Sequence, residues 1–105
     1  TSARLNTRYN ADFTYGRFEM RAKLPSGQGS WPAFWMMPTD EVYGTWPRSG
    51  EIDILEAVNL KTVAEDGTVE ANIHGTLHYG REWPNNSSSG NAYALPDGIF
   101  QVFTL

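Results

Sequence analysis

Three closely spaced carboxylates are the residues most capable of chemistry in this sequence. Glu51, Asp53 and Glu56 lie in the stretch GEIDILEAVN, and aliphatic residues separate them. Ile, Val and Leu favour strands with a buried face, whereas a buried carboxylate needs a partner or a shifted pKa. Clustered carboxylates can supply one acid and one base near neutral pH. The stretch therefore predicts a β-strand that carries an acid–base site.

The spacing of the acids predicts an irregularity in that strand. Glu51 and Asp53 are two residues apart and share a face, but Glu56 is five residues from Glu51 and would face the opposite side of a regular strand. A β-bulge corrects this parity by one inserted residue, so we predict a bulge within Ile54–Leu55 that brings all three acids to one face. Bulges are enriched beside active sites.

The distance between the outer acids bears on the reaction. With the bulge, the backbones of Glu51 and Glu56 are roughly 13 Å apart, and side chains that lean together shorten the gap. Retaining glycosidases need carboxyls about 5–5.5 Å apart, and inverting ones need about 6.5–9.5 Å. The spacing permits the shorter distance and leaves both outcomes open.

A structural alternative is an exposed acidic face that is paired with Arg17, Arg21 or Lys23. A run of charges is most often a solvated surface. However, three acids on one face of a strand repel one another, and a purely structural strand gains nothing from that cost. The clustering therefore favours a functional site.

The elements around the acids read as short strands joined by turns. No long window has a helical period, whereas alternating runs recur between clusters of Gly, Pro and Asn. We expect strands over residues 2–9, 15–24, 31–38, 51–58, 72–79 and 99–105. Residues 25–30, 39–50, 59–70 and 81–98 are expected to be loops, with a turn at Asp66–Gly67. This pattern indicates an all-β, antiparallel β-sandwich or barrel.

Composition excludes several classes of function. The 105 residues carry a net charge of −4, which disfavours nucleic acid as a partner, and they contain no Cys. Disulfides, thiol chemistry and Cys–zinc sites are therefore excluded. No apolar run approaches the roughly 18 residues of a membrane span. Both ends fall inside expected strands, so we expect a fragment whose open sheet edges could associate.

Three segments in order resemble glycoside hydrolase family 16. GEIDILE matches the bulged E-x-D-x-x-E signature of that family, and YGRFEMRAKLPSGQGSWPAFWMMP and HGTLHYG resemble the flanking segments of endo-1,3-β-glucanases (laminarinases). The resemblance covers nearly the whole chain. It implies a jelly-roll (concanavalin A-like) sandwich with an open cleft, of which residues 1–105 would be the central part, truncated at both ends.

The resemblance also implies roles for the acids. Glu51 resembles the nucleophile and Glu56 the general acid/base of a retaining double displacement. Asp53 resembles the middle acid that tunes the nucleophile.

Several further residues are implied to bind the sugar chain. Trp31 and Trp35 resemble cleft residues, for which the alternative is a place in the core. His78 resembles a cleft residue on the leaving-group side, whereas His74 is expected to be structural and a metal site of the two is disfavoured. Met36 and Met37 are expected to fill the core. Weaker candidates, at the edge or rim of the cleft, are Arg4, Trp83 and Asn86.

The implied protein is a secreted endo-β-1,3-glucanase that is monomeric at full length. Its partner is a polysaccharide, with neither nucleic acid nor membrane involved. The chemistry needs no cofactor, and the family's structural calcium site would use segments outside this chain. Alternatives are a hydrolase or transglycosylase for mixed-linkage glucan, agarose, porphyran or carrageenan, and a non-catalytic β-glucan-binding protein.

Overall fold

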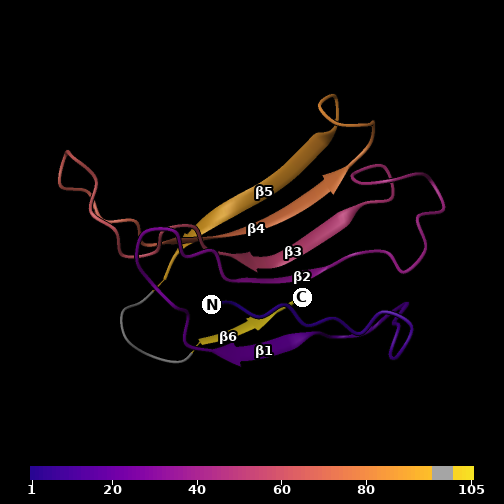
Figure 1. The fold of residues 1–105 in the computed structure, drawn as a ribbon, viewed down its shortest axis with the longest axis horizontal. Coiled ribbons are helices and arrows are strands. Elements are labelled where there is room, and N and C mark those ends of the chain that lie inside the picture. Colours follow the sequence, from indigo (N-terminus) through magenta and orange to yellow (C-terminus); the bar gives the residue numbers. More distant parts are fainter. Residues whose placement is uncertain (96–100) are drawn as a thin grey trace.

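Two antiparallel β-sheets make up the part of the chain that the structure describes, residues 1–95 and 101–105 of a computed structural model. The larger sheet has the order β2–β3–β4–β5, and the smaller sheet pairs β1 with β6 (Figure 1). The strands are β1 (Glu19–Ala22), β2 (Ala33–Met36), β3 (Glu51–Glu56), β4 (Asn72–Tyr79), β5 (Ser87–Ala94) and β6 (Gln101–Thr104). The expected all-β, antiparallel class is confirmed.

Alternation of apolar and charged residues explains why β1 forms. Its apolar side chains are half-buried, and its charged ones are exposed. The half-buried set is Phe18, Met20, Ala22 and Leu24, and the exposed set is Arg17, Glu19, Arg21 and Lys23. A strand with this period buries one face and leaves the other in water.

The core lies where β3 meets the smaller sheet. Leu55 and Ala57 are fully buried, Leu60 is nearly so, and Phe103 contributes from β6, which contacts β3. Burial of a side chain such as Leu55 stabilises the fold by roughly 1.5–3 kcal/mol. The apolar side of β3 therefore fixes the strand that carries the acids.

Two of the expected secondary-structure assignments were wrong. Residues 2–9 form no strand. Their last residues belong to a turn in which the N–H groups of Asn10 and Ala11 donate hydrogen bonds to the Thr7 carbonyl. Leu5 is 94% exposed, so the alternation there has no sheet to pack against.

Residues 81–98 are not one loop, because β5 occupies Ser87–Ala94. Its small polar residues have weak strand propensity, but they pair with β4 along the whole strand. Tertiary pairing overrides propensity here. The predicted strand over 99–105 is present from Gln101 to Thr104, and its first two residues lie outside the described part of the chain.

The expected turn is present in the remaining segments, whereas one of the two expected core methionines is exposed. The turn at Asp66–Gly67 is confirmed, since the Gly67 N–H donates to the Ala64 carbonyl and Gly67 has a φ of 82°. Met36 is half-buried, but Met37 is 41% exposed and does not fill the core as expected. Within the described residues, no helix is long and apolar enough to cross a membrane.

Candidate active site

A β-bulge interrupts β3 at the predicted place. Asp53 pairs with Thr76 and Glu56 pairs with His74, so Ile54 and Leu55 together oppose the single residue between them on β4. The β2 side shows the same shift, because Leu55 pairs with Phe34 whereas Asp53 pairs with the next residue, Trp35. The bulge within Ile54–Leu55 is confirmed from both neighbouring strands.

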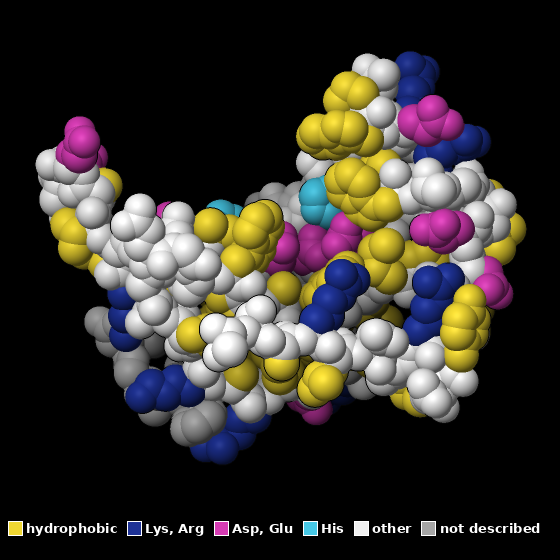
Figure 2. All heavy atoms as spheres, in the orientation of Figure 1, with side chains coloured by type: hydrophobic (Ala, Val, Ile, Leu, Met, Phe, Trp, Pro, Cys, Tyr) yellow, Lys and Arg dark blue, Asp and Glu magenta, His cyan; other side chains and the backbone are white. Residues whose placement is uncertain are grey.

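The bulge places the three acids on one face of the sheet. Their partners on β4 are His78 for Glu51, Thr76 for Asp53 and His74 for Glu56. These partners are two residues apart, so they share a face, and the acids opposite them share it too. Acidic side chains lie at the bottom of a hollow, with histidine and hydrophobic side chains beside them (Figure 2).

Asp53 is the most buried of the acids. It is 4% exposed, and His78 Nε2 lies 3.1 Å from its Oδ2. That contact is not aligned as a hydrogen bond, so both carboxylate oxygens lack a hydrogen-bond partner among the described residues. Burial, followed by the charges of Glu56 and Glu51, raises the pKa of Asp53 to about 6, against a smaller lowering by His78. The middle acid therefore exchanges its proton near neutral pH rather than as an ordinary aspartate.

Trp46 lies in the loop between β2 and β3 and binds Glu51. Its indole Nε1–H donates to Glu51 Oε2, and its ring lies 5.9 Å from that of His78. Reasoning from the sequence missed Trp46. The available signal was its position five residues before Glu51, but a residue in a turn-rich loop carries no period that predicts where its ring points.

Trp31 makes the matching contact with Glu56. Its indole Nε1–H donates to Glu56 Oε1 at 2.9 Å, and the side chain is 66% exposed. The structure therefore places Trp31 beside the acids with a large apolar face open to solvent, and not in the core. Each of the two outer carboxylates is held by one indole N–H.

Trp35 and Arg4 lie next to each other at the same face. Trp35 pairs with Asp53 across β2 and β3, and the Arg4 guanidinium lies 4.8 Å from the centre of the Trp35 ring. Such a cation–π contact contributes about 0.5–1 kcal/mol at an exposed site. Both residues line a cavity of about 520 Å³ between β2 and the N-terminal segment.

The register between β3 and β4 sets which acid each histidine faces. His78 lies opposite Glu51, the residue that resembles the nucleophile, whereas His74 lies opposite Glu56. In an antiparallel pair the later residue of β4 meets the earlier residue of β3. The place of His78 on the leaving-group side, which the resemblance implies, stays a prediction.

The rim candidates differ in how near they come to the acids. Trp83 is 68% exposed and its ring lies 6.0 Å from that of Trp46. Trp46 and Trp83 together form an aromatic wall at the Glu51 end of the acidic row. Asn86 immediately precedes β5, and the described hydrogen bonds include none from Asn86 to the three acids.

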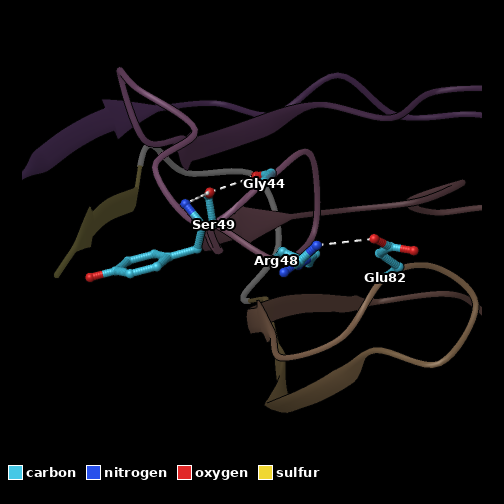
Figure 3. A network of polar contacts seen from close by, with 5 residues as sticks. Gly44, Arg48, Ser49 and Glu82 are labelled. Atoms are coloured by element: carbon cyan, nitrogen blue, oxygen red, sulfur yellow. Dashed lines mark hydrogen bonds and ion pairs between the residues drawn. The ribbon is translucent and has the colours of Figure 1, made fainter.

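Polar contacts tie together the two loops that carry this aromatic wall. Arg48 Nη1 lies 3.0 Å from Glu82 Oε1, which links the loop before β3 to the turn before β5 (Figure 3). Within the first loop, the Ser49 hydroxyl donates to the Gly44 carbonyl at 2.6 Å and accepts from the Tyr43 N–H. The Arg48 chain also packs against Gly44, where a Cβ would come within 3.2 Å of it. These contacts position Trp46 and Trp83 next to each other.

The structural alternative for the acids was pairing with Arg17, Arg21 or Lys23, and the structure tests it at Arg17. Arg17 instead forms an ion pair of 2.7 Å with Glu19. Among the described residues, no group of three or more His, Cys, Asp or Glu side chains is placed to hold a metal ion. The expectation that a structural calcium would use segments outside this chain stays a prediction.

Comparisons with known proteins show the family to which the chain is similar. The family model for the XgeA-like, catalytic GH16 domain matches residues 3–93. The chain is 47% identical over 98 residues to glucan endo-1,3-beta-glucosidase A1 of Niallia circulans, covering 93% of this chain and 13% of that protein. It is 52% identical over 87 residues to the beta-1,3-glucan-binding protein of Penaeus monodon, covering 82% of this chain and 23% of that protein.

A solved structure supports the same fold. The laminarinase catalytic domain from Thermotoga maritima MSB8 superposes with a TM-score of 0.69 at 38% identity, over 93% of this chain and 38% of that one. The two sheets thus correspond to part of a jelly roll, and the chain spans less than a third of the two curated relatives. The matched family model, together with the bulged acidic strand, shows that the chain belongs to glycoside hydrolase family 16.

Proposed function

We propose that this chain supplies the catalytic centre of a retaining endo-β-1,3-glucanase. One observation carries the proposal: the bulge in β3 puts Glu51 and Glu56 on one face, where each is held by a separate indole N–H. Because the chain spans only part of its relatives, the activity is proposed for the complete protein that contains it. Secretion of that protein is part of the same proposal.

Glu51 acts as the nucleophile in the first half of the reaction. Trp46 binds Oε2, which leaves Oε1 to attack the anomeric carbon. The bond from that carbon to the leaving oxygen breaks as Glu56 donates its proton to that oxygen. Trp31 binds Glu56 Oε1, so the transferred proton resides on Oε2. The product of this half-reaction is a glycosyl ester of Glu51.

Glu56 acts as a base in the second half of the reaction. Its carboxylate takes a proton from water as the water oxygen attacks the anomeric carbon, and the ester bond to Glu51 breaks. The sugar is released with its original anomeric configuration. Asp53 lies between the two glutamates in the strand, and its proton exchange near neutral pH limits the negative charge that both must face.

The substrate is proposed from the relatives and from the chemistry of the face. A relative with 47% identity is named a glucan endo-1,3-beta-glucosidase, and one of the matching solved structures is a laminarinase catalytic domain. Exposed indoles at both ends of the acidic row, Trp31 and Trp83, offer flat apolar faces of the kind on which sugar rings stack. No cofactor is required for this chemistry.

A second candidate is a β-glucan-binding protein without activity, because one relative carries that name at 52% identity. The two candidates differ in what the carboxylates do. Exchange of Glu51→Gln in the full-length protein should reduce release of reducing sugar from laminarin by at least about a thousandfold and retain glucan binding. A wild-type protein that binds glucan without cleaving it would favour the second candidate.

The stereochemical course tests the mechanism itself. We expect the β-anomer as the first product when cleavage by the wild-type protein is followed by proton NMR. An α-anomer as the first product would contradict double displacement through Glu51.

A further inference from the structure

We propose that a cavity at the Glu56 end of the acidic row is the subsite for the sugar on the leaving-group side, with His74 as a central polar residue. The inference rests on the proposed function, because only a glycosidase has a leaving sugar. It assigns a binding role to His74 and to the hairpin 61–70, neither of which the sequence singled out for substrate.

The cavity lies on the same face as the acids. It has a volume of about 460 Å³, and Asn72 and His74 of β4 form part of its wall. These two residues share their face with Thr76 and His78, the partners of Asp53 and Glu51. Small-molecule sites have volumes of about 300–1,000 Å³, so this cavity can hold a sugar ring.

The hairpin 61–70 forms the opposite wall. It projects beyond the end of the larger sheet (Figure 1), and its residues Thr62, Val69 and Glu70 line the cavity. The Lys61 N–H donates to the Glu70 carbonyl at 2.7 Å, and the Glu70 N–H donates to the Thr62 carbonyl at 2.9 Å. These paired bonds make the wall a defined β-hairpin.

The base of the hairpin is anchored to the segment that carries Trp31. Leu60 is 2% exposed, and its carbonyl accepts from the Gly27 N–H at 2.7 Å. Asn59 Oδ1 accepts from the Gly29 N–H at 2.7 Å, and the Asn59 N–H donates to the Ser30 carbonyl. The cavity wall and the indole that holds Glu56 therefore belong to one connected unit, and a fixed wall is what a binding subsite requires.

Polar side chains with unused capacity face this space. The described hydrogen bonds use neither the His74 ring nor the Asn72 amide, and Glu70 Oε1 accepts only from the Asn72 N–H. An imidazole, an amide and a carboxylate together offer donors and acceptors for neighbouring sugar hydroxyls. Val58 and Val69 add apolar wall, which is the mixture typical of small-molecule sites.

The reaction sets which part of the substrate lies there. Glu56 donates the proton to the leaving oxygen, so the sugar bonded to that oxygen starts at the Glu56 end of β3. His74 is the residue directly opposite Glu56. At the other end, Glu51 lies with His78 and Trp46, where the sugar that forms the ester is held.

Two substrates separate this subsite from the rest of the site. The first is a β-1,3-gluco-oligosaccharide that continues past the cleaved bond. The second is an aryl β-glycoside with the same donor sugars but an aromatic leaving group, which places no sugar in the cavity. In the full-length protein, His74→Ala should lower kcat/KM for the oligosaccharide by about tenfold or more relative to the aryl glycoside.

A second, cavity-filling variant keeps the subsite testable if the His74→Ala protein misfolds. Ala64 lines the cavity from the exposed hairpin, so Ala64→Phe fills the space without disturbing the core and should lower the same ratio. Glu65→Gln, on the same hairpin but outside the cavity lining, is the matched control and should leave the ratio unchanged. A ratio within twofold of wild type for both His74→Ala and Ala64→Phe overturns the subsite.

The outcome also distinguishes the subsite from the proposed function. A wild-type protein that cleaves both substrates, with variants that lose equally on both, contradicts the subsite alone. A wild-type protein that cleaves neither contradicts the proposed function and the subsite with it.

Discussion

Replacement of Asp53 by Asn should change how stability depends on pH. The Asp53 side chain is almost fully buried between two further acids, and its pKa rises from an ordinary value of 3.8 to about 6. In the unfolded chain the same carboxyl titrates at its ordinary value. Each pH unit between the two values corresponds to about 1.4 kcal/mol, so the ionised carboxylate destabilises the fold by roughly 3 kcal/mol.

The sign follows from proton binding. Between the two pKa values the folded protein holds a proton on Asp53 that the unfolded chain has released, so the free energy of unfolding falls as pH rises. This stability is fully present below about pH 4 and is lost by about pH 7. Asn cannot ionise and loses nothing over this range.

Urea unfolding of the full-length protein, followed by tryptophan fluorescence, measures the effect. From about pH 3.5 to about pH 7.5, the stability of the Asp53→Asn variant relative to wild type should rise by up to roughly 3 kcal/mol. Asp66→Asn is an informative control, since Thr68 donates to Asp66 and lowers its pKa, which gives the opposite sign of pH dependence. Parallel curves for wild type and Asp53→Asn would refute the reasoning.

Three other changes test the geometry of the site and of the sheet. Trp46→Phe keeps an aromatic ring but removes the donor to Glu51, so kcat on β-glucan should fall about tenfold or more in steady-state assays; an unchanged kcat would contradict a positioning role. Deletion of Ile54 removes the inserted residue and leaves the two glutamates an even four residues apart, so a regular strand keeps both on one face and hydrolysis should remain measurable; loss of all activity while circular dichroism still reports β-structure would contradict the parity argument. Gly90→Ala places a Cβ against the Gly75 carbonyl oxygen, so the free energy of unfolding should drop by about 1–3 kcal/mol in thermal melts; an unchanged melt would show that β5 shifts freely.

The bulge shows how far reasoning from the sequence alone can reach. Side chains alternate with a period of two along a strand, so the odd step between Glu51 and Glu56 required one extra residue if the acids were to act together. The register on both sides of β3 contains that residue. The same local period gave the two faces of β1, and local turn chemistry gave the turn at Asp66–Gly67.

The register between strands lay beyond such reasoning. Which His faces which Glu depends on how β4 slides against β3, and a shift of pairing changes every partner while leaving the sequence pattern intact. The pairing of His78 with Glu51 and of His74 with Glu56 could not be predicted for that reason. Likewise, the residues of β5 have little intrinsic preference for a strand, and β5 forms because it pairs with β4 along its whole length.

By itself, the sequence determined the antiparallel class, the strand that carries the acids and the bulge that aligns them, because these follow from local periods. Only the tertiary structure decided that Trp46 and Trp31 hold the two outer carboxylates, and that the hairpin 61–70 and His74 line one cavity. Those contacts join segments that are distant in sequence or that lie in loops, where no repeating pattern specifies the direction of a side chain. Strand pairing and packing set that direction.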